Sequence, residues 1–192
     1  YIMTTLEELG LLKMDFLGLR TLTVIQDTIN LVKQNRGIDV EFDKDMSDPK
    51  VYKLWQEGNT SGIFQFESQG MTNFMKELKP DCLEDLIAGV SLYRPGPMDQ
   101  IPRYIRGKQN PGHNEYTHPS LEPILNVTYG CMVYQEQVMQ IVRDLAGYSL
   151  GRADLVRRAM GKKKLDVMAK EREIFINGQL DENGNIIVPG CV

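Results

Sequence analysis

Residues 131–160 read CMVYQEQVMQIVRDLAGYSLGRADLVRRAM and contain the patterns of two consecutive helices. Apolar side chains of the first lie three or four positions apart and therefore share one helix face: Val138, Ile141, Val142 and Leu145. Gly147 ends this helix, because glycine readily adopts the left-handed conformation that closes a helix. Ser149 can cap a second helix that runs to about Met160. The stretch therefore predicts a helical pair, preceded by a short strand at residues 131–134.

Helical patterns also occur on both sides of this pair. We expect helices at about residues 22–36, 49–57, 69–78, 80–92 and 165–176. Asp48 or Ser47 before Pro49 is a helix-start signal, and Ser68 can cap the next helix. Four of these helices should face a core with the following apolar side chains: Leu22, Ile25, Ile29 and Val32; Val51, Leu54 and Trp55; Met71, Phe74, Met75 and Leu78; and Leu83, Leu86, Ile87 and Val90.

Strand signals are few and short. Residues 11–16 alternate apolar and charged side chains, so a strand there would place Lys13 and Asp15 on one face. The sequence Asp-Glu-Asn-Gly at 181–184 is a hairpin signal between two short strands. Residues 103–123 are rich in Pro, Gly, Asn and His and predict a long surface connection. The expected fold class is therefore α+β, mainly α-helical.

Composition restricts the class of protein. The 192 residues are 42% hydrophobic and 25% charged with a net charge of −4, which suits a folded chain and argues against disorder. No apolar run approaches the length of a membrane span, and the first residues do not resemble a signal peptide, so we expect a cytoplasmic protein without a membrane partner. Three widely spaced cysteines argue against a disulfide framework. We interpret the two histidines as loop residues and not as metal ligands. The absence of an initiator Met and the apolar triplet at 186–188 favour an internal segment of a longer protein.

The strongest charge feature lies near the C-terminus. Eight basic side chains lie between Arg152 and Arg172, and four acidic ones lie among or directly after them, although the whole chain is acidic. Such a local reversal is typical of a contact with phosphates or nucleic acid. Adjacent helix positions such as Arg157 and Arg158 point in different directions, whereas Arg158 and Lys162 share a face. The alternative is an ordinary solvated helix end whose cations are favoured by the helix dipole.

Lys13 and Asp15 are a second, weaker candidate site. A carboxylate on a strand can hold Mg²⁺ together with phosphate oxygens, and a neighbouring lysine can balance triphosphate charge. Phosphoryl-transfer sites need at least two carboxylates, and this segment supplies one. A surface ion pair is the alternative.

Five ordered motifs resemble bacterial replicative DNA polymerases of the C family, the DNA polymerase III alpha subunits. They cover nearly the whole chain: LKMDFLGLRTLT at 12–23, GIFQFES at 62–68, YRPGP at 93–97, YGCMVYQEQ at 129–137 and RRAMGKKK at 157–164. The resemblance implies an internal fragment, with residues 1–20 at the C-terminal edge of the palm and residues 21–192 in the fingers.

The same resemblance implies an activity and a set of site residues. The full-length parent would be a DNA-directed DNA polymerase that adds deoxynucleotides to a primer 3′ end by two-metal phosphoryl transfer with Mg²⁺. Asp15 would be one of three metal-binding catalytic carboxylates, and Lys13 would lie beside it. Arg157, Arg158, Lys162 and Lys163 would approach the incoming nucleotide or the DNA.

Several parts of such a polymerase lie outside these residues, including the other two aspartates and the regions that meet the sliding clamp and the clamp loader. We therefore expect the fragment alone to be inactive. Two other interpretations remain open from the sequence: a non-catalytic DNA-binding module built on the basic helix, and a scaffold that binds a protein through residues 103–123.

Overall fold

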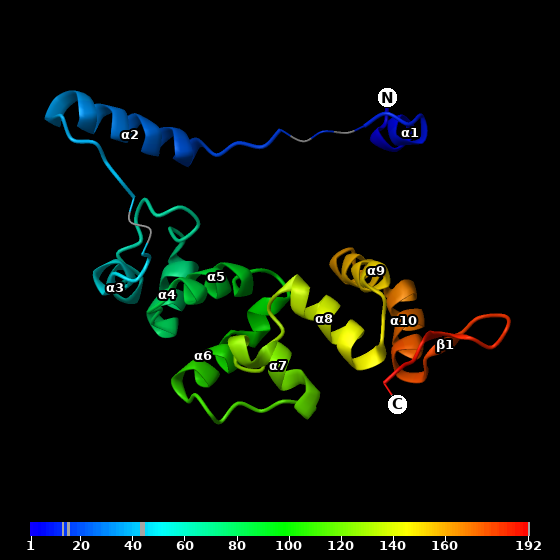
Figure 1. The fold of residues 1–192 in the computed structure, drawn as a ribbon. Helices are drawn as coiled ribbons and strands as arrows, with labels where there is room; N and C mark the ends of the chain where they lie inside the picture. Colours follow the sequence, from blue (N-terminus) through cyan, green and yellow to red (C-terminus); the bar gives the residue numbers. More distant parts are fainter. Residues whose placement is uncertain (13, 15, 43–44, 192) are drawn as a thin grey trace. The chain divides into compact units, whose positions relative to one another are not determined.

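The structure, a computed structural model, describes residues 1–12, 14, 16–42 and 45–191 and is mainly helical, with one two-stranded sheet in the described part (Figure 1). The expected fold class is confirmed. The chain forms two compact units, Tyr1–Met46 and Ser47–Val192. Within the described ranges, no helix combines the length and the apolar character needed to cross a membrane.

The first unit contains helices α1 (Met3–Glu8) and α2 (Arg20–Arg36). The prediction of α2 and of its end is confirmed, because Gly37 caps it in the left-handed conformation. The predicted burial is wrong, since α2 has no buried residue and Leu22 is 61% exposed. With so few residues, the described part of this unit offers no second layer against which the apolar stripe could pack.

The strand expected at residues 11–16 is absent from its described positions 11, 12, 14 and 16. A strand needs a partner for its backbone groups, and the described part of the first unit contains no strand that could supply one. Lys13 and Asp15 lie outside the described residues.

The second unit holds the remaining helices and the hairpin. Its α-helices are α3 (Pro49–Glu57), α4 (Gln69–Leu78), α5 (Leu83–Leu92), α6 (Ile101–Gln109), α7 (Glu122–Leu125), α8 (Gln135–Ala146), α9 (Leu150–Gly161) and α10 (Leu165–Asn177). Short 3₁₀ turns are η1 (Pro97–Gln100), η2 (Pro119–Leu121) and η3 (Asn126–Thr128). Strands β1 (Gln179–Leu180) and β2 (Ile186–Val188) pair antiparallel around the predicted turn, which confirms the hairpin.

Capping side chains begin three of these helices where the sequence predicts. The Asp48 carboxylate accepts a hydrogen bond from the Lys50 amide at 2.8 Å, and the Ser68 hydroxyl accepts one from the Met71 amide at 3.3 Å. Ser149 caps α9 in the same way. Such caps satisfy amides that have no partner inside the helix.

Two apolar cores organise the second unit. The first gathers α3 to α6, and its buried members are Trp55, Phe66, Met71, Phe74, Met75, Leu78, Ala88, Leu92, Tyr104 and Cys131. The second lies among α8, α9 and the hairpin, and its buried members are Val142, Ala146, Tyr148, Ala153, Val156 and Val188. The predicted stripe of α4 is fully buried, whereas α3 buries Tyr52 and Trp55 and leaves Val51 and Leu54 exposed.

Helix α5 begins at Leu83, later than predicted. The predicted inward face is confirmed in part, because Leu86 and Val90 pack, half-buried, against the first core. Leu83 and Ile87 are exposed, and the buried positions are Asp85, Ala88, Gly89 and Leu92. The reason is close packing on α4, since a Cβ at Gly89 would lie 2.5 Å from the terminal carbon of Met75. Small side chains therefore decide which face is inward.

Two further predictions are wrong. Residues 131–134 form no strand, because the Gln137 side-chain oxygen accepts hydrogen bonds from the Val133 and Tyr134 amides, both at 2.9 Å, and so takes the place of a partner strand. The surface connection expected from residue 103 is helical in its first part, where α6 occupies Ile101–Gln109. Proline in the first turn of α6 is compatible with a helix start, since no helical hydrogen bond is lost there.

Candidate functional site

Helix α9 carries the central part of the basic segment, and Arg152 fixes its N-terminal end. The Arg152 guanidinium forms an ion pair with Glu171 of α10 at 3.2 Å, bonds to Gln179 of β1 and lies 5.1 Å from the centre of the Tyr148 ring. The buried Tyr148 hydroxyl donates to the Glu171 carboxylate at 3.0 Å. Arg152 is therefore an internal brace, and its charge does not contribute to an open basic surface.

Arg157 and Arg158 share a single carboxylate. Nε and Nη2 of Arg157 donate to Asp154 Oδ1 at 2.9 and 2.7 Å, and Nε of Arg158 forms an ion pair with Asp154 Oδ2 at 2.7 Å. Although the two arginines leave the helix in different directions, both reach back one turn to the same residue. The hydrogen bond from Arg157, and then the charges of both guanidinium groups, hold the pKa of Asp154 below its usual range.

A third partner orients Arg157. Its Nη1 donates to the side-chain oxygen of Gln135, at the start of α8, at 2.7 Å. Gln135 is 22 positions away, so this contact joins α9 to α8. A guanidinium held on two sides keeps a fixed direction, which lowers the entropy that it loses when it binds a ligand.

Three consecutive lysines follow at the end of α9. The helix closes through backbone bonds from the Lys162 amide to Arg158 and from the Lys164 amide to Ala159, both at 3.0 Å, and Lys163 adopts φ +51°. The side chains of Lys162, Lys163 and Lys164 are exposed and make no ion pair within the described ranges. The carboxyl end of the helix dipole favours this group of cations.

The arrangement suits a contact with phosphates. Arg157, Arg158 and the three lysines are called the α9 cationic cluster below, and Asp154 is the carboxylate that pairs with its two arginines. Guanidinium groups present paired donors that match phosphate oxygens, and lysines add point charges. Within the described residues the cluster has no paired carboxylates, so its chemistry is binding and charge neutralisation.

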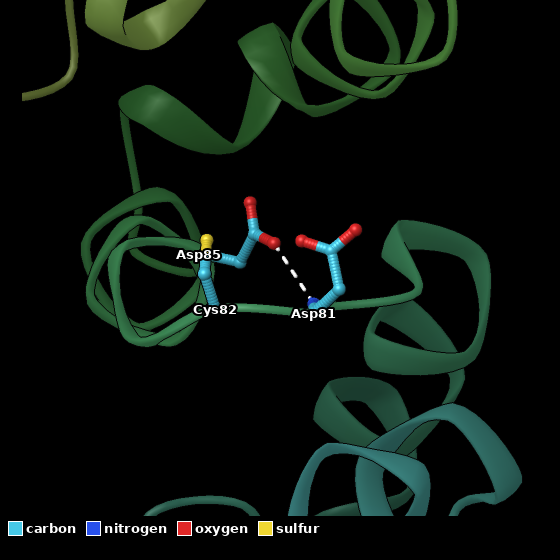
Figure 2. Close-up of side chains that lie close together, drawn as sticks. All are labelled: Asp81, Cys82 and Asp85. Atoms are coloured by element: carbon cyan, nitrogen blue, oxygen red, sulfur yellow. Dashed lines mark hydrogen bonds between the residues drawn. The ribbon is translucent and has the colours of Figure 1, made fainter. Parts of the chain in front are cut away.

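A possible metal-binding group lies elsewhere, at the start of α5. Asp81, Cys82 and Asp85 lie together (Figure 2). Their possible ligand atoms lie within 4.8 Å of one another. The ammonium of Lys108 already lies 2.6 Å from Asp85 and 3.0 Å from Asp81. Burial raises the pKa of Cys82 to about 11, which keeps the thiol protonated. This group is therefore a structural ion-pair cluster.

Comparisons with known proteins identify the family of this chain. Residues 21–183 match the family described as the bacterial DNA polymerase III alpha subunit finger domain. The DNA polymerase III alpha subunit of Thermus aquaticus is 53% identical over 184 residues, which are 93% of this chain and 15% of that protein. The chain belongs to the finger-domain family of bacterial DNA polymerase III alpha subunits.

Other relatives agree with this assignment. The subunit from Aquifex aeolicus is 50% identical over 94% of this chain and 16% of its own length, and the one from Staphylococcus aureus is 49% identical over 93% and 17%. The chain thus spans less than a fifth of the length of these relatives. The family resemblance of the five motifs is confirmed.

Within this finger domain, Arg157 and Arg158 lie on α9, Lys162 is its C-cap residue and Lys163 follows it. Their proposed contacts with nucleotide or DNA stay predictions. Lys13 and Asp15 lie outside the described residues, so their roles stay predictions. Sequence reasoning missed the partners of Arg157. The three-residue spacing of Asp154 was a usable signal, whereas nothing local indicated Gln135.

The cap of α9 gives a test of how this cluster is held. Ser149→Ala is expected to lower the free energy of unfolding by about 1 kcal/mol, because the Arg152 amide loses its 3.3 Å hydrogen bond. Urea unfolding measures the change. Ser149→Gly is the matched control and should cost only a few tenths of a kcal/mol, roughly, since glycine is a tolerated cap. Equal losses for both changes would show that the hydroxyl does not act as a cap.

Proposed function

We propose that the full-length parent is the DNA-dependent DNA polymerase that replicates the bacterial chromosome, and that this chain supplies its finger surface. The family match over residues 21–183, together with the α9 cationic cluster, carries this proposal. The fragment contributes one candidate carboxylate of the palm and the finger surface for nucleotide and template, and the other two carboxylates would come from outside it, so it is expected to be inactive alone.

The cluster can act on an incoming nucleotide through charge. A deoxynucleoside triphosphate carries several negative charges that increase on the leaving pyrophosphate. Arg157, held by Asp154 and Gln135, would contact these oxygens without first reorganising, and Arg158 would exchange part of its bond to Asp154 for a phosphate. Preorganised cations of this kind stabilise developing charge more than mobile ones do.

Mg²⁺ is the expected cofactor, and Asp15 is the residue of this chain proposed to hold it. A carboxylate oxygen is a suitable ligand for Mg²⁺, but one carboxylate does not make a two-metal site. Two further aspartates would come from outside these 192 residues. When bound, the two ions would lower the pKa of the primer hydroxyl and neutralise the leaving group. Lys13 is proposed to lie near the triphosphate or the primer.

The partners proposed for the parent are primer–template DNA and the incoming deoxynucleotide. The sliding clamp and the clamp loader would bind through regions outside this chain. The proposed compartment is the cytoplasm, where the chromosome is copied. The three cysteines are free thiols in the structure, which is compatible with a reducing compartment.

A binding experiment tests the cluster. The 192-residue chain is expected to bind primer–template DNA weakly, with an affinity that falls steeply as salt increases. The triple change Arg157→Ala, Arg158→Ala and Lys162→Ala should weaken binding at least about tenfold and reduce the log–log salt slope by roughly two to three, because each lost phosphate contact removes about 0.9. Fluorescence anisotropy over a salt series measures both quantities.

The control removes the same charge elsewhere. Lys50→Ala, Lys53→Ala and Arg143→Ala take three exposed cations from α3 and α8 and should leave the salt slope nearly unchanged. Equal losses in both triple variants would mean that total charge, and not the α9 cationic cluster, drives binding. DNA binding that requires the cluster, without any binding of nucleotide by the full-length parent, would favour the non-catalytic DNA-binding alternative.

A further inference from the structure

A polar pocket lies beside α6, away from the α9 cationic cluster in the sequence. Its volume is about 770 Å³, and it is lined by α6, by residues 113–117 and by Tyr129. This volume is within the range of small-molecule and cofactor sites, roughly 300–1,000 Å³. Apart from Tyr129, its lining residues fall in the stretch 103–123.

Two glycines let the walls of this pocket approach each other. A Cβ at Gly107 would lie 2.4 Å from Tyr129 Cβ, so α6 can contact Tyr129 only through a glycine. Gly130 has φ +80°, and a Cβ there would lie 2.8 Å from the carbonyl oxygen of Glu115. Arg103 completes the wall, because its Nη2 donates to the same carbonyl at 2.7 Å. The segment 113–117 is thereby tied to α6.

The lining is positively charged and rich in hydrogen-bond donors. Arg103 and Arg106 are the cationic members of the lining, and Glu115 is its acidic member. The Arg106 side chain makes no hydrogen bond or ion pair within the ranges that the structure describes. Asn110 and Asn114 add amide groups, and the rings of Tyr116 and Tyr129 add aromatic surface.

We propose that this pocket binds one nucleotide unit of single-stranded DNA, with a backbone phosphate at Arg103 and Arg106 and the base against a tyrosine ring. This inference rests on the proposed function, since the DNA substrate supplies the strand. Proteins that bind single strands combine cations that follow the backbone with aromatic side chains on which bases stack.

An acidic peptide is the competing ligand, and the lining favours a nucleotide. A peptide carboxylate would use the arginines alone, whereas a nucleotide also uses the amides and an aromatic ring, which recognise the edges and faces of exposed bases. The two ligands differ in their dependence on the base. An oligonucleotide with abasic positions keeps its phosphates and loses the stacking surface.

The experiment follows the backbone amide signals of the whole 192-residue chain by NMR while oligothymidylate of ten nucleotides is added. Signals of residues 103–117, 129 and 130 are expected to shift together, and the abasic oligonucleotide should shift them at about tenfold higher concentration, the scale of one stacked base. A photoreactive 5-iodouracil oligonucleotide should crosslink to Tyr116 or Tyr129, which mass spectrometry of peptides identifies.

Single changes test the assigned contacts. Arg106→Gln is expected to weaken binding at the pocket about tenfold, the scale of one charge-assisted hydrogen bond, and to lower the salt slope by roughly 0.7, the single-strand value. If the base stacks on the Tyr116 ring, Tyr116→Ala should also weaken binding at the pocket about tenfold. If the base stacks on the Tyr129 ring, Tyr129→Ala should have this effect. Glu115→Gln should strengthen binding severalfold, because it removes the opposing charge. Arg143→Gln on α8 is the control and should change nothing at the pocket.

The outcomes separate this proposal from the previous one. Shifts confined to residues 149–164 would overturn the pocket and leave the proposed function intact. Shifts confined to the pocket would support it and count against the α9 cationic cluster. Equal binding of abasic and normal strands, or equal binding of a poly-glutamate peptide, would overturn the nucleotide assignment. If the amide spectrum of Arg106→Gln shows loss of folding, Arg106→Lys replaces it. This change keeps the charge and should retain most of the binding.

Discussion

Replacing Asp15 by Asn in the full-length parent is expected to lower the rate of nucleotide addition at least about a hundredfold, the scale of losing one strong electrostatic contact to the transition state. The amide keeps the shape of the carboxylate but lacks the negative charge on which binding of a divalent cation depends. Folding and DNA binding should stay nearly unchanged. Single-turnover primer extension measures the rate, and anisotropy with primer–template DNA measures the binding.

A second carboxylate from the same part of the chain serves as the control. Asp27→Asn on α2 changes the same charge at an exposed position outside the five family motifs, and it should leave extension within about twofold, as is usual for surface changes. Extension by the Asp15→Asn parent at the wild-type rate would remove Asp15 from the catalytic set. The isolated fragment should not extend a primer with Mg²⁺, because a lone carboxylate cannot assemble two metal ions.

The sequence predicted those parts of the fold that short-range signals determine. Asp48, Ser68 and Ser149 begin helices because each cap satisfies amides two or three residues away. Gly37 and Gly147 end helices in the left-handed conformation for an equally local reason. Helix starts and ends can therefore be found without knowledge of the tertiary structure.

The wrong predictions depend on contacts between distant residues. The apolar triplet after Cys131 has the composition of a strand, but Gln137 takes its backbone donors, and the Gln137 side chain is itself fixed by the Ile124 carbonyl and the Thr128 hydroxyl. Nothing in the pattern of residues 131–134 indicates this. The inward face of α5 likewise depends on Met75 of α4, which hydrophobic periodicity along α5 cannot include.

In the candidate site too, short-range signals were predicted and contacts between distant residues were not. The spacing of Arg158 and Lys162 predicts a shared helix face, and in the structure Lys162 is the C-cap residue that follows α9. The motif resemblance identified the segment that the family comparison supports. That Arg152 is an internal brace could not be predicted, because its partner Glu171 is 19 positions away and on another helix. Counting charges along the sequence therefore includes Arg152 in an open basic surface to which it does not contribute.

The ion pair between Lys108 and Asp85 is expected to contribute most to the stability of the second unit among the described ion pairs. Asp85 is only 2% exposed, and its Oδ2 accepts from Lys108 at 2.6 Å and from the Asp81 amide at 3.0 Å. Lys108 belongs to α6 and Asp85 to α5, so the pair joins two helices of the first core. Removing one partner leaves a buried charge without compensation, which costs about 3–5 kcal/mol.

We therefore expect Lys108→Ala to lower the free energy of unfolding by about 3 kcal/mol or more, measured by urea denaturation of the 192-residue chain. Asp81→Asn is the control, because Asp81 is 72% exposed and its pair with Lys108 should contribute about 1 kcal/mol or less. The double change Lys108→Met with Asp85→Asn should recover much of the loss, since no unpaired charge remains buried. A loss as large in the double variant as in Lys108→Ala would mean that packing of the lysine stem is responsible.

The pH dependence gives an independent check of the same pair. Burial alone would lower the pKa of Lys108, but the hydrogen bonds to Asp85 and Asp81 outweigh it and raise the pKa above its ordinary value of 10.5. Because the folded chain holds this proton more tightly than the unfolded chain does, the stabilisation is complete below pH 10.5 and is lost as the pH rises through the folded pKa. Wild-type chain should thus lose stability in strongly alkaline solution by more than Lys108→Ala does. Parallel alkaline profiles for wild type and Lys108→Ala would contradict the assigned role of Lys108.

At the acid end, the hydrogen bond from Lys108 holds the pKa of Asp81 below 3.8. The smaller stabilisation from Asp81 is therefore present above pH 3.8 and is lost as the pH falls through the lowered value.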